Sequence, residues 1–239
     1  MPVFWADKAR AELGDDRFEA AQRDPLSLDL LAWNVFQSLE THFDPDWLAY
    51  RLQQLGGTGL AAPVRLQLYT GRTGQPLLQP SRGYLATARQ RAEAAGAGAA
   101  DIEAFRAPSE IPVRIESPDV LCLVDTLMDT VDRGVAGRER LLELIDAGLE
   151  HSRRLSKTLA VAVVYRSGSE AARQISARLD QLRRTLAEEL PHQPGAGKVQ
   201  LREVGWQQLL RVWESEVEYL NLPTSARPFL EHVKRHGLY

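Results

Sequence analysis

The sequence predicts an α/β protein in which helices flank a mixed central β-sheet. Two segments, 63–69 and 111–116, alternate apolar and polar residues, as half-buried strands do. A third segment, Thr158–Tyr165, is continuously apolar and indicates a strand covered on both faces, which we expect to lie centrally. Stretches with apolar residues every three or four positions precede, separate and follow these strands, which favours helices packed on one sheet.

The composition is that of an ordinary globular protein. The chain has 239 residues, of which 44% are hydrophobic and 26% charged, and this excludes a disordered or collagen-like chain. Its single cysteine, Cys122, excludes an intrachain disulfide and a zinc site with four thiolate ligands, and we expect a cytoplasmic protein. We expect an N-terminal tail over residues 1–23 and one α/β domain over residues 24–239.

Net charge and hydropathy give no reason to expect that nucleic acid or a membrane attracts the molecule as a whole. The formal net charge is −3, so binding to DNA or RNA would need a local basic patch. Apolar runs are far shorter than the roughly 20 residues that span a bilayer, and the N-terminus is acidic, so we expect neither a membrane span nor a signal peptide.

The first half of the domain begins with two helices. Asp24-Pro25 and Asp44-Pro45 both combine an N-cap with a proline suited to the first helical turn, and Gly56-Gly57 ends the second helix. The strand at 63–69 follows. Residues 70–108 are rich in Gly, Pro, Ala and Gln, which predicts a long surface excursion with one helix around Leu85–Ala94.

The second half begins with a β-hairpin. Strands at 111–116 and 120–128 are joined by the turn Ser117-Pro118-Asp119. Helices at 138–151 and 170–190 then alternate with strands at 158–165 and 198–204, and helices at 206–219 and 225–236 close the chain.

This layout resembles the PD-(D/E)XK endonuclease-like superfamily. The stretch Asn34–Glu40 followed by Trp47-Leu48 is similar to the first helices of a bacterial nuclease-like group, and Val204–Leu210 is similar to its last strand and helix. The hairpin Glu110–Leu127 falls where such proteins carry their catalytic signature. The resemblance covers most of residues 24–236 and implies a restriction-endonuclease-like core.

The resemblance also implies a set of catalytic positions, of which two are substituted here. The superfamily needs an acidic metal ligand on the first hairpin strand, and an acid and a lysine two residues apart on the second. Pro112, Asp125 and Leu127 stand at these positions. Proline offers no side-chain ligand and leucine no charge, so Asp125, even with Glu40 from the helix, would hold a cation weakly. The resemblance therefore indicates a nuclease fold without catalysis and without a cofactor.

An active enzyme is the first alternative. Glu116, Asp119, Asp125 and Asp129 place four carboxylates close together in the sequence, and a shifted register could bring a pair of them around Mg²⁺ or Mn²⁺. The candidate catalytic residues are then Asp125, Glu40 and Glu116, with Asp125 as the metal ligand. Asp119 is better explained as a turn residue.

Local basic clusters are the candidates for nucleic-acid contact. They flank the helix after the hairpin and comprise Arg133, Arg138 and Arg140 on one side and Arg153, Arg154 and Lys157 on the other. Three functional hypotheses follow. The first is an inactive nuclease-like subunit that binds DNA or RNA, or assembles with protein partners or with itself, in a bacterial defence or DNA-processing complex. The others are an active metal-dependent nuclease and a structural adaptor without nucleic-acid binding.

Overall fold

The computed structural model describes residues 1–42, 44–70, 79–96, 110–128, 139–215, 220 and 222–239. Its elements are, in chain order, α1 (Ala6–Leu13), α2 (Asp15–Arg23), α3 (Leu28–Ala32), the π-helix η1 (Trp33–Gln37), α4 (Pro45–Gly56), β1 (Arg65–Thr70), α5 (Arg82–Ala94), β2 (Ile111–Glu116), β3 (Val120–Thr126), α7 (Arg140–Arg154), β4 (Thr158–Tyr165), α8 (Glu170–Glu189), the 3-10 helix η3 (Ala196–Lys198), β5 (Gln200–Gly205), α9 (Trp206–Ser215) and α10 (Ala226–Arg235).

The described strands form one mixed sheet in the order β1-β2-β3-β4-β5. β1, β2 and β3 pair antiparallel, whereas β4 and β5 continue parallel to β3. The α/β class and the mixed sheet are thus confirmed. The middle strand is β3, and β4, which we expected at the centre, lies beside it with neighbours on both sides.

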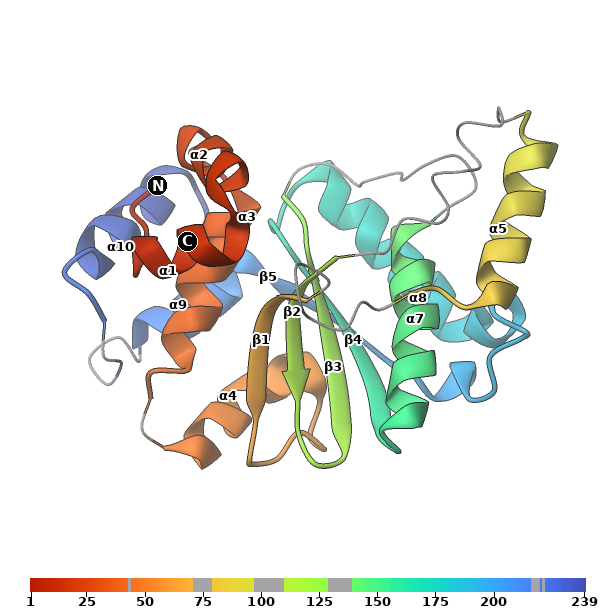
Figure 1. The fold of residues 1–239 in the computed structure, drawn as a ribbon. Coiled ribbons are helices and arrows are strands. Elements are labelled where there is room, and N and C mark those ends of the chain that lie inside the picture. The colour runs from red at the N-terminus through yellow and green to blue at the C-terminus, as the bar shows by residue number, and fades with distance from the viewer. Residues whose placement is uncertain (43, 71–78, 97–109, 129–138, 216–219, 221) are drawn as a thin grey trace.

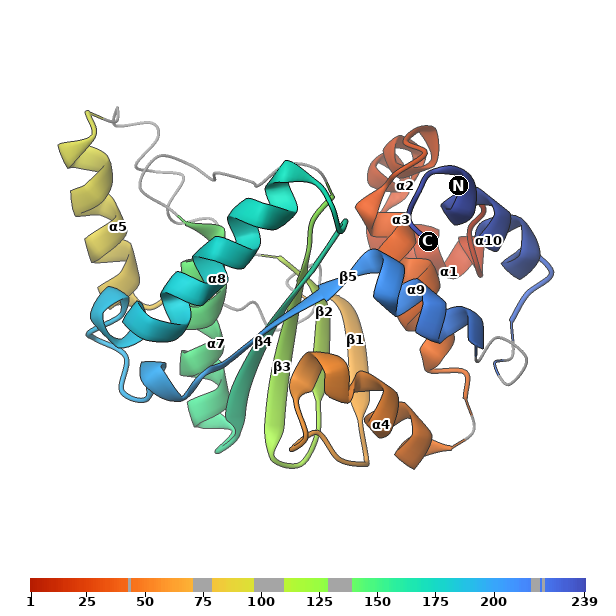
Figure 2. The same ribbon diagram turned by 180° about the vertical axis from the view of Figure 1, so that it is seen from behind.

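Helices cover both faces of the sheet (Figure 1). One face packs against α5, α7 and α8, with Leu123, Val161 and Leu179 in the core between them. The other packs against α4, the N-terminal helices and α9–α10, with Cys122, Ala162 and Trp206 in that core. Figure 2 shows α8 crossing the first of these faces from the opposite side of the molecule. We refer to them below as the α7 face and the α4 face.

Residues 1–23 are part of the domain and do not form the tail that we expected. They fold into α1 and α2, and Phe4, Leu13 and Phe18 are buried in the core of the α4 face. Phe4 stacks on Trp213 of α9 with a centroid distance of 6.0 Å and meets Phe229 of α10 edge-on at 5.2 Å. The two ends of the chain therefore pack into one lobe beside the sheet (Figure 1).

The hairpin has the register that period-two alternation predicts. Arg114 pairs with Leu123, and Glu116 pairs with Leu121. Because cross-strand partners point to the same side of a sheet, the side chains of Arg114, Glu116 and Asp125 all project from the α7 face.

The expected surface excursion contains the predicted helix as α5, while 71–78 and 97–109 lie outside the described residues. The Ser81 hydroxyl caps α5 by accepting a hydrogen bond from the Tyr84 N–H at 3.1 Å. Among the described helices, none is long and apolar enough to cross a membrane.

Candidate functional site

Asp125 lies near the carboxyl end of β3, where it is 4% exposed. Arg140, the first residue of α7, donates from Nε to both carboxylate oxygens at 3.1 and 3.0 Å and from Nη2 to Oδ1 at 2.9 Å. Arginine presents its donors in a fixed planar fork that matches a carboxylate. Asp125, which the resemblance assigned to the acidic catalytic position, is therefore paired with a guanidinium group of the same chain.

A second arginine engages two further carboxylates, one just before β2 and one on α3. Arg17 of α2 donates from Nη1 to Glu110 at 2.7 Å and from Nε to Asp29 of α3 at 2.5 Å. Arg140 links this pair to Asp125, because its Nη2 also donates to the Glu110 carbonyl at 3.2 Å. Burial works against the charge of Arg17, but the Asp29 and Glu110 carboxylates raise its pKa above the usual arginine value, so it stays charged.

We call these five residues the arginine–carboxylate chain: Arg17, Asp29, Glu110, Asp125 and Arg140. It joins a helix of the α4 face to the first turn of α7 around the ends of β2 and β3. Of these five residues, the sequence predicted a functional role for Asp125 and Arg140 only, the first as a catalytic residue and the second as a nucleic-acid contact. Arg17 and Glu110 are 93 residues apart, so no local pattern could have paired them.

A small cavity adjoins Asp125 and Arg140 between the carboxyl ends of β3 and β4 and the helices α7 and α8. Its volume is about 110 Å³. Its walls are mainly apolar, and its rim carries a second ion pair, in which Arg178 of α8 donates to the Glu139 carboxylate at 2.7 and 2.6 Å. In open α/β sheets, ligands bind outside the carboxyl ends of the strands, so this is the conventional position for a site.

Glu116 lies on the same face as Asp125 but toward the other end of the hairpin. Its partner on β3 is Leu121, which places it about 13 Å along the strands from Asp125 at roughly 3.3 Å per residue. Lys157 and Arg114 each donate to its carboxylate at 2.6 Å. Burial raises the pKa of Glu116, but the charges of Lys157 and Arg114 together outweigh burial, so the pKa is lowered overall.

Glu40 belongs to the opposite side of the sheet. It is exposed just after η1 and accepts a hydrogen bond from Gln37 at 2.7 Å. The neighbouring Ser38 accepts one from Trp213, which is part of the core of the α4 face. The structure thus separates the three candidate catalytic residues: Asp125 and Glu116 are at opposite ends of one face, and Glu40 is beyond the other.

The described residues do not fit a divalent cation at Asp125. A hard cation needs several oxygen ligands around a shared point, whereas both oxygens of the Asp125 carboxylate accept hydrogen bonds from Arg140. The described part of the chain also holds no group of three or more His, Cys, Asp or Glu that could bind a metal. Asp129, the remaining alternative ligand, lies outside the described residues.

The predicted basic clusters have different surroundings. Arg133 and Arg138 lie outside the described residues. Arg140 and Lys157 are engaged with Asp125 and Glu116. Arg153 donates to Glu150 and Gln193 with 45% of its side chain exposed, and Arg154 is 77% exposed and 3.8 Å from Glu150. Of the four members of these clusters that the structure describes, Arg154 is the most accessible to a ligand.

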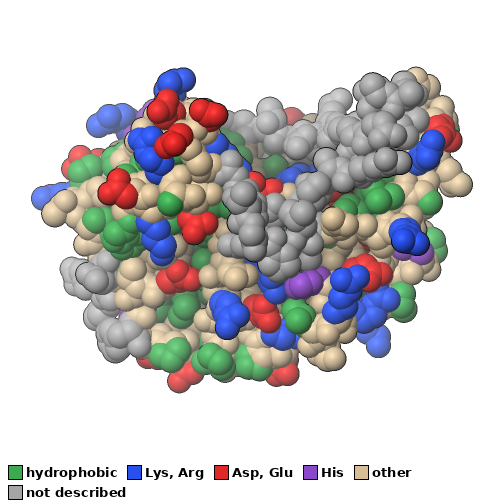
Figure 3. Space-filling view, viewed as in Figure 1, with side chains coloured by type: hydrophobic (Ala, Val, Ile, Leu, Met, Phe, Trp, Pro, Cys, Tyr) green, Lys and Arg blue, Asp and Glu red, His purple; other side chains and the backbone are tan. Residues whose placement is uncertain are grey.

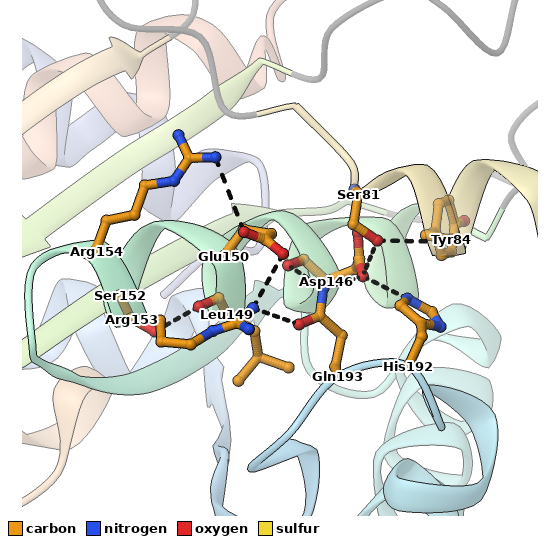
Figure 4. Close-up of polar contacts among 10 residues, drawn as sticks. All are labelled: Ser81, Tyr84, Asp146, Leu149, Glu150, Ser152, Arg153, Arg154, His192 and Gln193. Atoms are coloured by element: carbon orange, nitrogen blue, oxygen red, sulfur yellow. Dashed lines mark hydrogen bonds and ion pairs between the residues drawn. The ribbon is translucent and has the colours of Figure 1, made fainter.

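Sequence reasoning missed a buried polar cluster in the middle of α7 (Figure 4). Asp146 is fully buried and accepts hydrogen bonds from Ser81 before α5 and from Gln193 after α8; His192 Nε2 lies 2.8 Å from it. A signal for it exists in the sequence, since Asp146 adjoins the apolar positions Ile145 and Leu149 of the helix. An acid at such a position requires partners.

Comparisons with known proteins add no family to this geometry. No protein-family model, no curated protein and no solved structure matches the chain. The similarity to the PD-(D/E)XK superfamily therefore stays a prediction from the sequence, and the proposal below depends on the residues themselves.

Proposed function

We propose that this chain is a catalytically inactive PD-(D/E)XK-like protein that acts as a nucleic-acid-binding or assembly subunit of a bacterial defence or DNA-processing complex. One observation carries the loss of catalysis. The Asp125 carboxylate, which would have to hold the metal ion, is held by the guanidinium group of Arg140 through three hydrogen-bond contacts.

The surroundings of Asp125 support the same reading. Pro112 and Leu127 provide no ligand or charge beside it. Glu110 and Asp29, the other acids of the arginine–carboxylate chain, share Arg17. A cation would have to displace a paired arginine to reach Asp125, and leaving that charge without a partner in a partly buried place is costly.

The basic surface at the end of α7 supports binding of a polyanion. Figure 3 shows Lys and Arg side chains gathered over the lower half of α7 as drawn in Figure 1. Arg153 and Arg154, both in the last turn of the helix, are at least 45% exposed. A few such contacts suffice for weak binding to phosphates that weakens with salt.

The test measures cleavage and binding together. Labelled single- and double-stranded DNA and RNA are incubated with wild-type protein in Mg²⁺, Mn²⁺ or EDTA, and binding is followed by fluorescence anisotropy at several salt concentrations. Asp125→Ala is compared with Asp119→Asn, which changes an exposed acid of the same hairpin. Arg154→Gln is compared with Arg173→Gln, which changes an arginine that is 72% exposed on α8.

The proposal expects salt-dependent binding without cleavage, weakened by Arg154→Gln and unchanged by Arg173→Gln. Metal-dependent cleavage that Asp125→Ala abolishes and Asp119→Asn preserves would refute it in favour of an active nuclease. Absence of both binding and cleavage would refute the nucleic-acid role and favour the adaptor hypothesis.

A further inference from the structure

The Asp146 cluster fixes the orientation of the His192 ring. The Asp146 carboxylate accepts from the Ser81 backbone N–H at 2.5 Å, the Ser81 hydroxyl at 2.9 Å and the Gln193 amide at 2.6 Å. The Ser81 hydroxyl donates to this carboxylate and accepts a hydrogen bond from the Tyr84 N–H. A carboxylate oxygen accepts hydrogen bonds, and the ring of His192 turns Nε2 toward Asp146 Oδ1 at 2.8 Å.

The other ring nitrogen of His192 points away from Asp146 (Figure 4). In the neutral ring, this Nδ1 holds a lone pair and accepts a hydrogen bond. The ring is held in place by Gly83, where an added Cβ would lie 2.6 Å from the ring atoms Cγ and Cδ2. About a quarter of the His192 side chain, 23%, remains exposed. The structure therefore orients a histidine with one nitrogen available.

His192 lines a surface cavity of about 470 Å³ between the start of α5 and the second half of α7. Arg82, Arg154 and Glu150 also line it. The two lining arginines outnumber the lining Glu150, which is also 3.0 Å from Arg153 outside the lining, so the cavity carries excess positive charge. The first turn of α5 adds backbone N–H groups without partners inside the helix.

We propose that this cavity binds a phosphate monoester group. Arg82 and Arg154 attract the anionic oxygens, and His192 Nδ1 accepts a hydrogen bond from the protonated oxygen of the singly charged phosphate. Sulfate and carboxylate anions carry no such proton, so the oriented histidine selects against them. This proposal rests in part on the proposed nucleic-acid role, because the terminal phosphate of a nucleic-acid strand is a phosphate monoester. A small phosphorylated molecule carries the same group.

The experiment uses the full chain and His192→Gln. Glutamine places an amide nitrogen near the position of Nε2 and so keeps a donor for Asp146 while removing Nδ1. Arg82→Gln removes the excess charge, and Arg89→Gln, on the same helix but paired with Glu93, is the matched control. Calorimetric titrations use inorganic phosphate and sulfate, and anisotropy compares one oligonucleotide with and without a terminal phosphate. Thermal melting confirms that each variant folds.

We expect phosphate to bind more tightly than sulfate. His192→Gln and Arg82→Gln should each weaken phosphate binding roughly tenfold or more, as the loss of one charge-assisted hydrogen bond does, whereas Arg89→Gln should not. A terminal phosphate that tightens oligonucleotide binding identifies a strand end as the source. Equal binding of both oligonucleotides excludes a strand end and leaves a small phosphorylated molecule as the source of the phosphate.

Two results would overturn the inference: no phosphate binding at millimolar concentration, or binding that His192→Gln and Arg82→Gln leave unchanged. Failure here is separable from failure of the proposed function. Unphosphorylated nucleic acid whose binding depends on Arg154 but not on His192 or Arg82 would sustain the general role while this cavity is rejected.

Discussion

Replacing Arg140 with alanine should destabilise the protein far more than replacing Arg140 and Asp125 together. The single change leaves the Asp125 carboxylate, whose side chain is 5% exposed, without its guanidinium partner. Removing one member of a buried ion pair typically costs 3–5 kcal/mol. Because the Arg140 side chain is itself 29% exposed, water can partly solvate the acid, and we expect about 3 kcal/mol.

The double variant Asp125→Leu/Arg140→Met removes both charges and keeps apolar volume. Exchanging both partners for apolar groups of similar shape is often nearly neutral. The double variant still loses the hydrogen bond from Arg140 to the Glu110 carbonyl, so we expect a cost of about 1 kcal/mol.

Urea unfolding monitored by tryptophan fluorescence measures these differences, with equal m-values as the check that the unfolding reaction is unchanged. In a chain of this length, about 3 kcal/mol corresponds to a decrease in Tm of roughly 6–12 °C. A single variant as stable as wild type, or a double variant less stable than Arg140→Ala, would refute the idea that Arg140 is held there to neutralise a buried Asp125.

Three further predictions concern other parts of the fold. Glu116→Gln should cost about 1–2 kcal/mol at pH 7 through the lost charge-assisted contact with Lys157. Burial raises the pKa of Glu116, but Lys157 and Arg114 outweigh burial and lower it overall. The stabilisation is therefore present above the unfolded pKa of about 4.3 and is lost as the pH falls through the lower folded pKa. A difference in unfolding free energy between the variant and wild type that persists in urea titrations at pH 2 would contradict this prediction. Gly83→Ala should cost about 1–3 kcal/mol, because its Cβ would lie 2.6 Å from His192, and an unchanged Tm would show that the ring can move at no cost. Burial raises the pKa of the Cys122 thiol to about 12, so iodoacetamide at pH 8 should modify it only in denaturant, as mass spectrometry would show.

Local patterns predicted most of the fold because the relevant interactions are local. Alternation at 111–116 placed Arg114 and Glu116 on one face, and the register with β3 confirms it. The expected N-terminal tail was wrong for a physical reason. Phe4 precedes α1, Leu13 ends that helix, and Phe18 lies in α2 beyond the break at Gly14, so no single helical period joins them. Their burial depends on residues distant in the sequence, such as the Trp213 that stacks on Phe4.

The site was less predictable because ion pairing is a property of the folded chain. The resemblance directed attention to Asp125, Pro112 and Leu127. The cation that contacts Asp125 comes from α7, however, and nothing in the spacing distinguishes Arg140 from other arginines there. Glu40 was grouped with Asp125 through the resemblance alone. The structure places it on the other side of the sheet, since η1 packs with the core of the α4 face.

The meeting of Phe4 with Trp213 has a consequence for how the protein is made. Phe4 and Trp213 are 209 residues apart in the sequence. At about 5–20 residues per second, a ribosome reaches Trp213 roughly 10–40 s after it has added Phe4. Throughout that interval the apolar side of α1–α3 lacks its cover from α9 and α10. The nascent chain therefore exposes an apolar surface that a chaperone would have to shield, and slower translation lengthens this exposure.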